Sequence, residues 1–341
     1  MSTRSRARLE DVASAAGVSR ITVSRAFSAP ERVHPDTLEH VLRLADQLGY
    51  RPSRHHKKHG GASQRVTLGV VNPNMSNPFF SGLTRAITMI GQQHGFEVVM
   101  FDSYESEAQE MTAIERMIQM GVSAVIVSVI SSNSNYQPKW RQALAEANIP
   151  LILVDREIDT APYAGVYIDN LDCGYKAGAW MARQQPESVL AISGLPGSRV
   201  SIGRTSGIRE ALGEIPLDVR YADFNMELAY HRMRARLGEG PPPSGVIGLN
   251  NQITLGIIRA CVEAGLRPLQ DILLFSIDEV QHADIFGLPI PCLRHDIDEI
   301  AYRTVALARQ ALEMPQAGGS RVVVRSTLKV PETHAPARGA E

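Results

Sequence analysis

The sequence predicts an all-helical head followed by an α/β core of two lobes. In the first fifty residues, apolar side chains recur every three to four positions in three short runs, which glycine and proline separate. From Val66 onward, apolar strands alternate with amphipathic helical stretches, the pattern of parallel sheets covered by helices on both faces. This part is longer than one such open sheet usually requires, so two lobes are expected.

The head predicts three helices. The first begins at Leu9 and stops at Gly17, and acidic residues occupy its first turn. Ser19 is a good N-cap for the second helix, which Pro30 ends. The third helix follows Val33 and closes before Pro52. A helix, a short glycine turn and a second helix form the geometry of a helix-turn-helix.

Charge supports a nucleic-acid partner for this head. Residues 1–58 carry a formal charge of +5, while the rest of the chain carries −6. The composition, 44% hydrophobic and 21% charged, is that of a globular protein and excludes global disorder, collagen and a coiled coil. A basic head on a mildly acidic body favours binding of a polyanion.

The motif in the head sharpens this prediction. The string Leu9-Glu10-Asp11-Val12-Ala13, followed by Ala16-Gly17-Val18-Ser19-Arg20-Ile21-Thr22-Val23-Ser24-Arg25, resembles the N-terminal module of the LacI/GalR family of bacterial repressors. A recognition helix enters the major groove by its N-terminal end, where Arg20 and Ile21 stand. Arginine pairs with guanine and isoleucine contacts a thymine methyl. Phosphates or further bases are expected to bind Ser19, Thr22, Ser24 and Arg25. The resemblance implies that positions 20 and 21 set operator preference.

Residues 51–65 form a basic joint with almost no apolar side chains, which indicates a flexible charged linker. In the family this place holds a hinge helix that folds on the operator and wedges a small residue and a leucine into the minor groove. His56 and His59 stand at those positions here. We therefore expect a phosphate clamp that kinks DNA less, formed by Arg54, His56, Lys57 and His59; a disordered tether is the alternative.

The core elements follow from the alternation. The expected strands are Val66–Val71, Val98–Phe101, Ala124–Val129, Leu151–Val154, Gly165–Ile168, Val189–Ile192, Gly245–Leu249 and Ile272–Ser276, and the expected helices lie near 79–93, 106–120, 138–147, 171–184, 202–213, 226–237 and 251–264.

The core resembles the ribose-type periplasmic binding proteins over about residues 65–333. This resemblance implies two Rossmann-like lobes joined by crossovers near residues 161, 289 and 322. The expected domains are the head (1–50), the linker (51–65), the two-lobed core (66–333) and a polar tail (334–341). Lobe 1 then takes about 66–161 and 290–322, and lobe 2 takes about 162–289 and 323–333.

Polar and aromatic residues follow the carboxyl ends of the strands, where open α/β sheets bind ligands. Such residues suit a sugar, because planar polar groups bind paired hydroxyls and aromatic faces stack on the ring. Carried over from the resemblance, the effector-binding positions are Asn77, Phe79, Phe80, Asp155, Arg156, Arg204, Phe224, Asn250, Asp278 and His295. His295 replaces the usual glutamine, which argues against ribose itself. Arg204 and Asp278 are expected on opposite walls of the cleft.

Other chemistry finds less support. The sequence contains no GxSxG, P-loop or HExxH motif, so we expect neither an enzyme nor a cofactor. The three cysteines have no CxxC spacing, and the three linker histidines have no thiol or carboxylate beside them, so no metal site is predicted. Arg199 and Arg294 are candidates for holding a phosphate or carboxylate. Without an apolar leader or membrane span, the expected location is the cytoplasm.

The function predicted from these features is a transcriptional regulator of repressor type, whose affinity for double-stranded operator DNA changes with a small sugar-like effector. The tail lacks the leucine heptads that build tetramers, so a homodimer is favoured. The alternative is a sugar-binding receptor without a DNA role. An enzyme on the same two-lobed scaffold is a third reading, which lacks a nucleophile or an acid–base pair.

Overall fold

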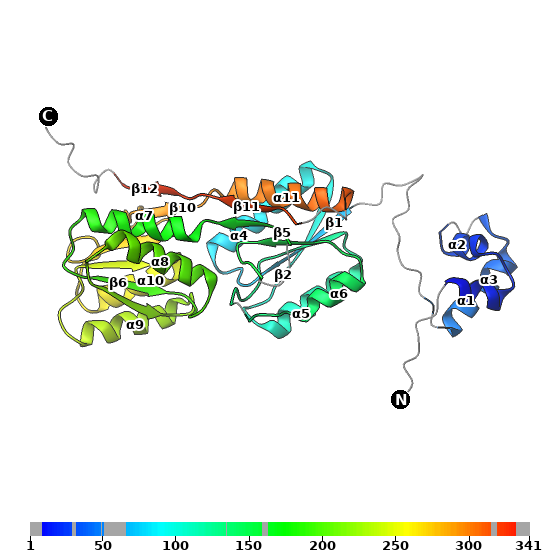
Figure 1. Ribbon diagram of the computed structural model, residues 1–341, viewed down its shortest axis with the longest axis horizontal. Helices are drawn as coiled ribbons and strands as arrows, with labels where there is room; N and C mark the ends of the chain where they lie inside the picture. Colours follow the sequence, from blue (N-terminus) through cyan, green and yellow to red (C-terminus); the bar gives the residue numbers. More distant parts are fainter. Residues whose placement is uncertain are drawn as a thin grey trace. The chain divides into compact units, whose positions relative to one another are not determined.

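The computed structural model describes residues 9–28, 32–48, 50, 66–133, 135–158, 163–314 and 319–331. The chain divides into two compact units, with the boundary after residue 64. The first contains helices α1 (Leu9–Ala16), α2 (Arg20–Ser28) and α3 (Pro35–Gln47), and the second contains every strand of the described residues (Figure 1). The linker positions Arg54, His56, Lys57 and His59 and the tail 334–341 lie outside the described residues.

The head is a three-helix unit around a small apolar core. Its buried side chains come from all three helices and are Val12, Ala13, Val23, Ala26, Val41 and Ala45. Gly17 has a φ of +65°, a conformation that L side chains rarely adopt, and it turns the chain from α1 into α2. The ring of Phe27 packs edge-on against Tyr50 at 5.6 Å, which closes the core after α3.

The first lobe of the core is built on a parallel sheet with strand order β11-β5-β4-β3-β1-β2. In chain order, its strands are β1 (Val66–Asn72), β2 (Phe96–Asp102), β3 (Ala124–Val127), β4 (Leu151–Val154), β5 (Ala164–Ile168) and β11 (Arg321–Val324). One face of this sheet is covered by α4 (Pro78–Gln93) and α11 (Ile297–Glu313), and the other by α5 (Glu107–Met120) and α6 (Trp140–Glu146).

The second lobe has the sheet order β12-β10-β9-β8-β6-β7, parallel except for the β12–β10 pair. Its strands are β6 (Val189–Ser193), β7 (Leu217–Tyr221), β8 (Gly245–Gly248), β9 (Leu273–Ile277), β10 (Cys292–Arg294) and β12 (Thr327–Lys329). Helices α7 (Asn170–Arg183) and α8 (Arg199–Leu212) pack together on one face, and α9 (Met226–Gly238) and α10 (Asn251–Glu263) on the other (Figure 1).

The crossovers between the lobes lie later in the chain than expected. Strand Ala164–Ile168 belongs to the first sheet and Cys292–Arg294 to the second, so the expected crossovers near 161 and 289 are placed too early. The third crossover lies between Val324 and Thr327 rather than near 322. The physical reason is that the chain leaves a parallel strand at its carboxyl end. The first two crossovers therefore follow β5 and β10, whose residues the expected boundaries placed in the other lobe.

The eight strands expected in the core are all present, and their boundaries differ from the expected ones by at most two residues. The helices expected from the sequence did not include α11, although Ile300, Thr304 and Ala308 recur on one buried face of this helix and Asp296 caps its start. It also omitted β7, β10, β11 and β12, which are three to five residues long. Strands this short carry too few alternations for a periodicity to stand out.

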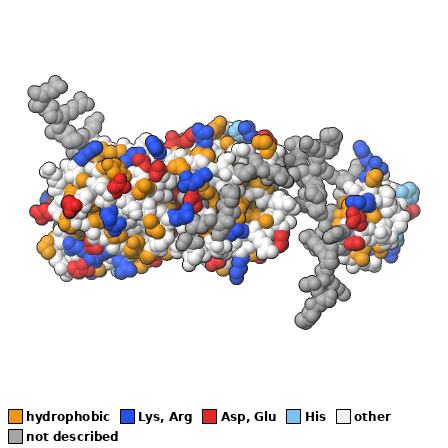
Figure 2. All heavy atoms as spheres, in the orientation of Figure 1, with side chains coloured by type: hydrophobic (Ala, Val, Ile, Leu, Met, Phe, Trp, Pro, Cys, Tyr) orange, Lys and Arg blue, Asp and Glu red, His pale blue; other side chains and the backbone are white. Residues whose placement is uncertain are grey.

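The core surface in view shows basic and acidic side chains interspersed, with apolar side chains between them (Figure 2). The described residues include no helix that is both long and apolar enough to span a bilayer. All three cysteines are buried as free thiols, and Cys261 packs in the apolar core.

Candidate functional site

The head presents the N-terminal end of α2 to solvent. The Ser19 hydroxyl caps this helix by accepting a hydrogen bond from the backbone N–H of Thr22 at 3.1 Å, as expected. Ile21, which follows, is 63% exposed although it is a large aliphatic side chain. Arg20 forms an ion pair with Glu10 at 3.0 Å, and both side chains are more than half exposed. Such a pair contributes little stability, so the guanidinium remains available to a partner.

The other predicted DNA contacts on α2 share this surface. Ser24 and Arg25 are exposed, whereas Val23 and Ala26, on either side of them, are buried in the head core. The helix therefore has one face fixed by packing and one face of polar, cationic and aliphatic side chains without a packing role. An exposed isoleucine beside two arginines matches what base edges and phosphates in a major groove require.

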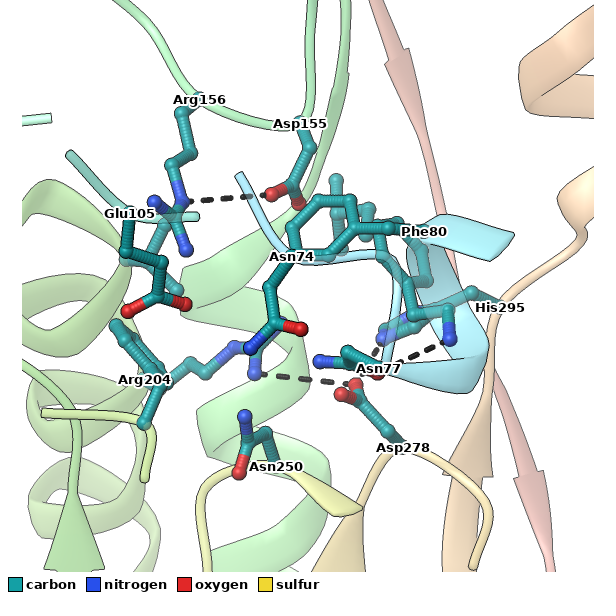
Figure 3. A pocket seen from close by; sticks show the side chains of 14 residues that line it. Asn74, Asn77, Phe80, Glu105, Asp155, Arg156, Arg204, Asn250, Asp278 and His295 are labelled. Atoms are coloured by element: carbon teal, nitrogen blue, oxygen red, sulfur yellow. Dashed lines mark hydrogen bonds and ion pairs between the residues drawn. The ribbon is translucent and has the colours of Figure 1, made fainter. Parts of the chain in front are cut away.

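The core carries a cavity at the carboxyl ends of the strands, between the two lobes. All ten residues predicted as effector-binding line it, and the structure thus brings together side chains from seven separate segments of the chain (Figure 3). The cavity is also lined by four residues that the sequence did not single out, namely Asn74, Glu105, Ile168 and Val200. Asn74 and Glu105 follow strands β1 and β2, so their place at the strand ends was a usable signal.

Two asparagines in the cavity owe their orientation to helix capping. Asn77 begins α4 and its Oδ1 accepts the backbone N–H of Phe79 at 3.0 Å. Asn250 begins α10 in the same way, with Ile253 as donor at 2.8 Å. The Oδ1 atom of Asn77 also accepts from the side chain of Asn251 at 3.1 Å. Because the oxygens are occupied, each amide has its NH₂ group left to donate to a ligand.

Asp155 and Arg156 follow β4 and form the charged part of the first-lobe wall. Asp155 has a φ of 68°, a left-handed conformation that is uncommon for a residue with a side chain and often marks functional sites. Arg156 donates to the backbone carbonyls of Val129 and Ile130 at 3.1 and 2.7 Å, and its Nε lies 3.8 Å from the Asp155 carboxylate. Arg156 is therefore fixed before any ligand arrives.

Burial raises the pKa of the Asp155 carboxyl above its ordinary value of 3.8, although Arg156 and Arg204 act to lower it. Because the folded-state pKa is the higher one, the stability that Asp155 contributes at low pH is lost as the pH rises through that value.

We therefore expect the unfolding free energy of the wild type to fall relative to that of Asp155→Asn between about pH 4 and pH 7. Urea unfolding at several pH values measures this difference. The exposed Asp284 supplies the matched control, Asp284→Asn. A difference between wild type and Asp155→Asn that stays constant over this range would contradict the assignment.

The second lobe contributes Arg204 and Asp278, whose side chains lie 3.8 Å apart. The expectation that they stand on opposite walls is wrong, because α8 and the loop after β9 both belong to the second lobe. Arg204 also donates to Asn170 at 2.9 Å and to the carbonyl of Leu249. The pair forms one anchored unit on one wall.

His295 connects this wall to a crossover. Its Nε2 lies 2.5 Å from Asp278, and its Nδ1 lies 2.5 Å from the hydroxyl of Ser326, between β11 and β12. The ring also packs edge-on against Phe79 at 5.7 Å. A histidine in this place binds with both ring nitrogens, so it orients Asp278 rather than standing free in the cavity.

Aromatic rings complete the lining. The Arg156 guanidinium lies over the rings of Phe80 and Phe224, at 5.7 and 5.8 Å from their centroids. Phe224 has a φ of 55° and its ring lies so close to Gly194 that a Cβ there would approach it to 2.1 Å. Because the glycine after β6 has no Cβ, the Phe224 ring can occupy this position in the cavity.

Direct contacts hold the lobes together around the cavity. Besides the Asn251–Asn77 bond, the hydroxyls of Ser132 and Ser198 lie 3.0 Å apart. Arg199 of the second lobe forms an ion pair with Glu157 of the first at 2.9 Å. These bonds connect the two lobes across the cleft, in addition to the crossovers.

Comparison with known proteins identifies the family. Residues 68–283 match the periplasmic binding protein domain, and residues 8–53 match the bacterial regulatory proteins of the lacI family. The chain belongs to the lacI family of bacterial regulators. This lacI-family protein is a DNA-binding transcriptional regulator, as the resemblance of its head predicted.

Relatives of this lacI-family protein match it over nearly their whole length. The transcriptional repressor PurR of Pectobacterium carotovorum (strain PC1) is 24% identical over 94% of this chain and 95% of its own. The repressor CytR of Escherichia coli (strain K12) is 25% identical over 93% of both chains. A solved complex of the transcriptional regulator CelR with cellobiose has a TM-score of 0.70, with 24% identity over 95% of this chain and 99% of its own, which shows the same fold.

Proposed function

We propose that this regulator is a repressor that binds a near-palindromic operator as a homodimer and responds to a small sugar-like effector in its cleft. The observation that carries the proposal is one chain with two sites, an exposed recognition helix and a polar–aromatic cavity between two lobes. The PurR and CytR relatives, both repressors, support the direction of control. Its place of action is then the cytoplasm, where operator DNA lies.

The dimer is supported by apolar side chains that the single chain leaves exposed. In the first lobe, Met89 on α4 and Met100 on the edge strand β2 are 50% and 57% exposed. In the second lobe, Ile285 and Phe286 are 74% and 80% exposed. A second copy of this chain is the partner we propose for these surfaces, because one helix-turn-helix reads too few base pairs to select an operator alone.

The receptor alternative is not favoured, since a transport receptor has no use for an exposed recognition helix. An enzymatic activity is not proposed either. Ser326, His295 and Asp278 do form a hydrogen-bonded line of the kind that hydrolases use. Ser326, however, is 3% exposed and is not among the residues that line the cavity, and its hydroxyl also accepts a bond from the Cys173 thiol. A substrate in the cavity does not reach such a nucleophile.

The test of the proposal is selection of operator sequences from random duplex DNA by the purified full-length protein. We expect a near-palindromic site that takes two copies of the chain, and a change in affinity when the effector is added. Arg20→Ala should relax base preference at one symmetric position by about 1–3 kcal/mol.

The matched control is Arg43→Ala, which removes an exposed arginine from α3 instead of α2. Its base preference should equal that of the wild type. If Arg20→Ala weakens binding equally on every sequence, Arg20 binds phosphate and does not read bases.

A further inference from the structure

The charges around the cavity define which sugar derivatives it accepts. Three carboxylates line it, those of Glu105, Asp155 and Asp278, against the two guanidinium groups of Arg156 and Arg204. His295 lies between Asp278 and a hydroxyl. The carboxyl groups that line the cavity thus outnumber the guanidinium groups.

Both guanidinium groups already have a carboxyl group and further hydrogen-bond partners within the protein. Arg156 has Asp155 beside it and donates to two backbone carbonyls of its own lobe, those of Val129 and Ile130. Arg204 has Asp278 beside it and donates to Asn170 and Leu249. Each keeps N–H groups for hydrogen bonds to a neutral oxygen, but its charge is balanced by an aspartate before a ligand binds.

The two other arginines that were candidates for binding a phosphate or carboxylate lie outside the cavity. Arg199 forms an ion pair with Glu157, which also binds Arg321 at 2.5 Å. Arg294 lies 3.7 Å from Glu279 and its side chain is 68% exposed. Neither lines the cavity, so the expectation that they serve a phosphate or carboxylate receives no support from their positions.

Glu105 stands at the rim of the cavity. It lines the cavity yet is itself exposed, and its carboxylate faces the space between Arg156 and Arg204 (Figure 3). Glu105 has a φ of 54° and its backbone N–H donates to the carbonyl of Pro73 at 2.7 Å, which fixes the turn. Desolvation within the cleft raises the pKa of Glu105 above its ordinary value, and the nearby Arg156 and Asn74 act to lower it.

We propose that the cleft takes an uncharged polyhydroxylated ring and rejects its phosphorylated or carboxylated derivatives, with Glu105 as the residue that excludes the anion. The carboxylates accept the ligand's hydroxyls, and the amide NH₂ groups of Asn77 and Asn250 donate to them. This inference rests on the proposed function of the cleft as the effector site.

The test is calorimetry on the full-length protein with sugars in matched neutral and anionic forms. The probes are D-glucose and D-galactose, each with its 6-phosphate, its uronate and its uronamide. The uronamide is close in size to the uronate but is uncharged, so the pair separates charge from shape. We expect an uncharged form to bind, and its anionic counterpart to bind roughly tenfold or more weakly.

Two variants assign the effect to Glu105. Glu105→Gln should reduce, several-fold, the ratio of the affinity for the neutral sugar to the affinity for its anionic form. Glu107→Gln, the same change at an exposed position that does not line the cavity, should leave the ratio as in the wild type.

An anionic form that binds the wild type as tightly as its neutral partner, or tighter, overturns the inference alone. A ratio that Glu105→Gln does not change overturns the role of Glu105. If no sugar of either kind binds, both the sugar-effector part of the proposed function and this inference fall.

Discussion

Replacing Arg204 by alanine is expected to weaken binding of the effector by about a hundredfold, while operator binding without effector is retained. Arg204 is 4% exposed and holds Asp278, Asn170 and the Leu249 carbonyl in place. Its removal leaves a buried carboxylate without its cation, a change that costs about 3–5 kcal/mol. Calorimetry with the uncharged sugar that binds the wild type measures the loss.

Two further variants separate binding from folding. Arg209→Ala removes an exposed arginine one turn later on α8 and should bind effector as the wild type does. Arg204→Lys keeps the charge beside Asp278 but loses the planar fork, so it should fold and still bind effector weakly. Unchanged affinity in both Arg204 variants would remove this residue from the site.

The second large effect is expected at Gly207, where α8 meets α7. A Cβ at this position would lie 2.2 Å from the carbonyl oxygen of Leu171 and 2.5 Å from the backbone nitrogen of Tyr175. A side chain can relieve such a clash by changing its rotamer, but backbone atoms cannot. Gly207→Ala must therefore push the two helices apart. We expect a loss of about 3 kcal/mol in the free energy of unfolding, measured with urea.

Gly238→Ala is the matched control, because a Cβ at the end of α9 would meet nothing within 4 Å. This variant should be as stable as the wild type or slightly more stable, since alanine favours a helix over glycine. If both variants unfold at the same urea concentration, the close approach of α7 and α8 does not limit stability.

Local signals predicted most of this structure. Gly17 and Ser19 mark the turn and the cap of the head, and both act in that way. The apolar strands of the core were recognisable because both faces are covered, which makes each strand a continuous apolar run. The ten cavity residues were found by combining strand ends with the family resemblance, and they do meet in one place.

What the sequence did not predict depends on distances through space. Which side of the cavity a residue lines depends on the sheet to which its strand belongs. Arg204 and Asp278 were therefore expected on opposite walls, although their side chains lie 3.8 Å apart on the same wall. Glu105 follows the edge strand β2 and belongs to no motif, so its place after a strand end did not by itself show that its side chain reaches the cavity. The placement of the crossovers likewise depends on which sheet a short strand joins, and this has no local signature.

Both sheets are completed by the same short segment near the end of the described chain. Strand β11 covers the edge of β5 in one lobe, and β12, two residues further on, covers the edge of β10 in the other. During synthesis, one edge of each sheet therefore stays unpaired until this segment has been made. For the first lobe, the segment is far in sequence from β5, the strand with which it pairs. Folding of the two lobes is thereby coupled at its last step, and a nascent chain that stalls before Arg321 exposes two strand edges that can pair with another chain.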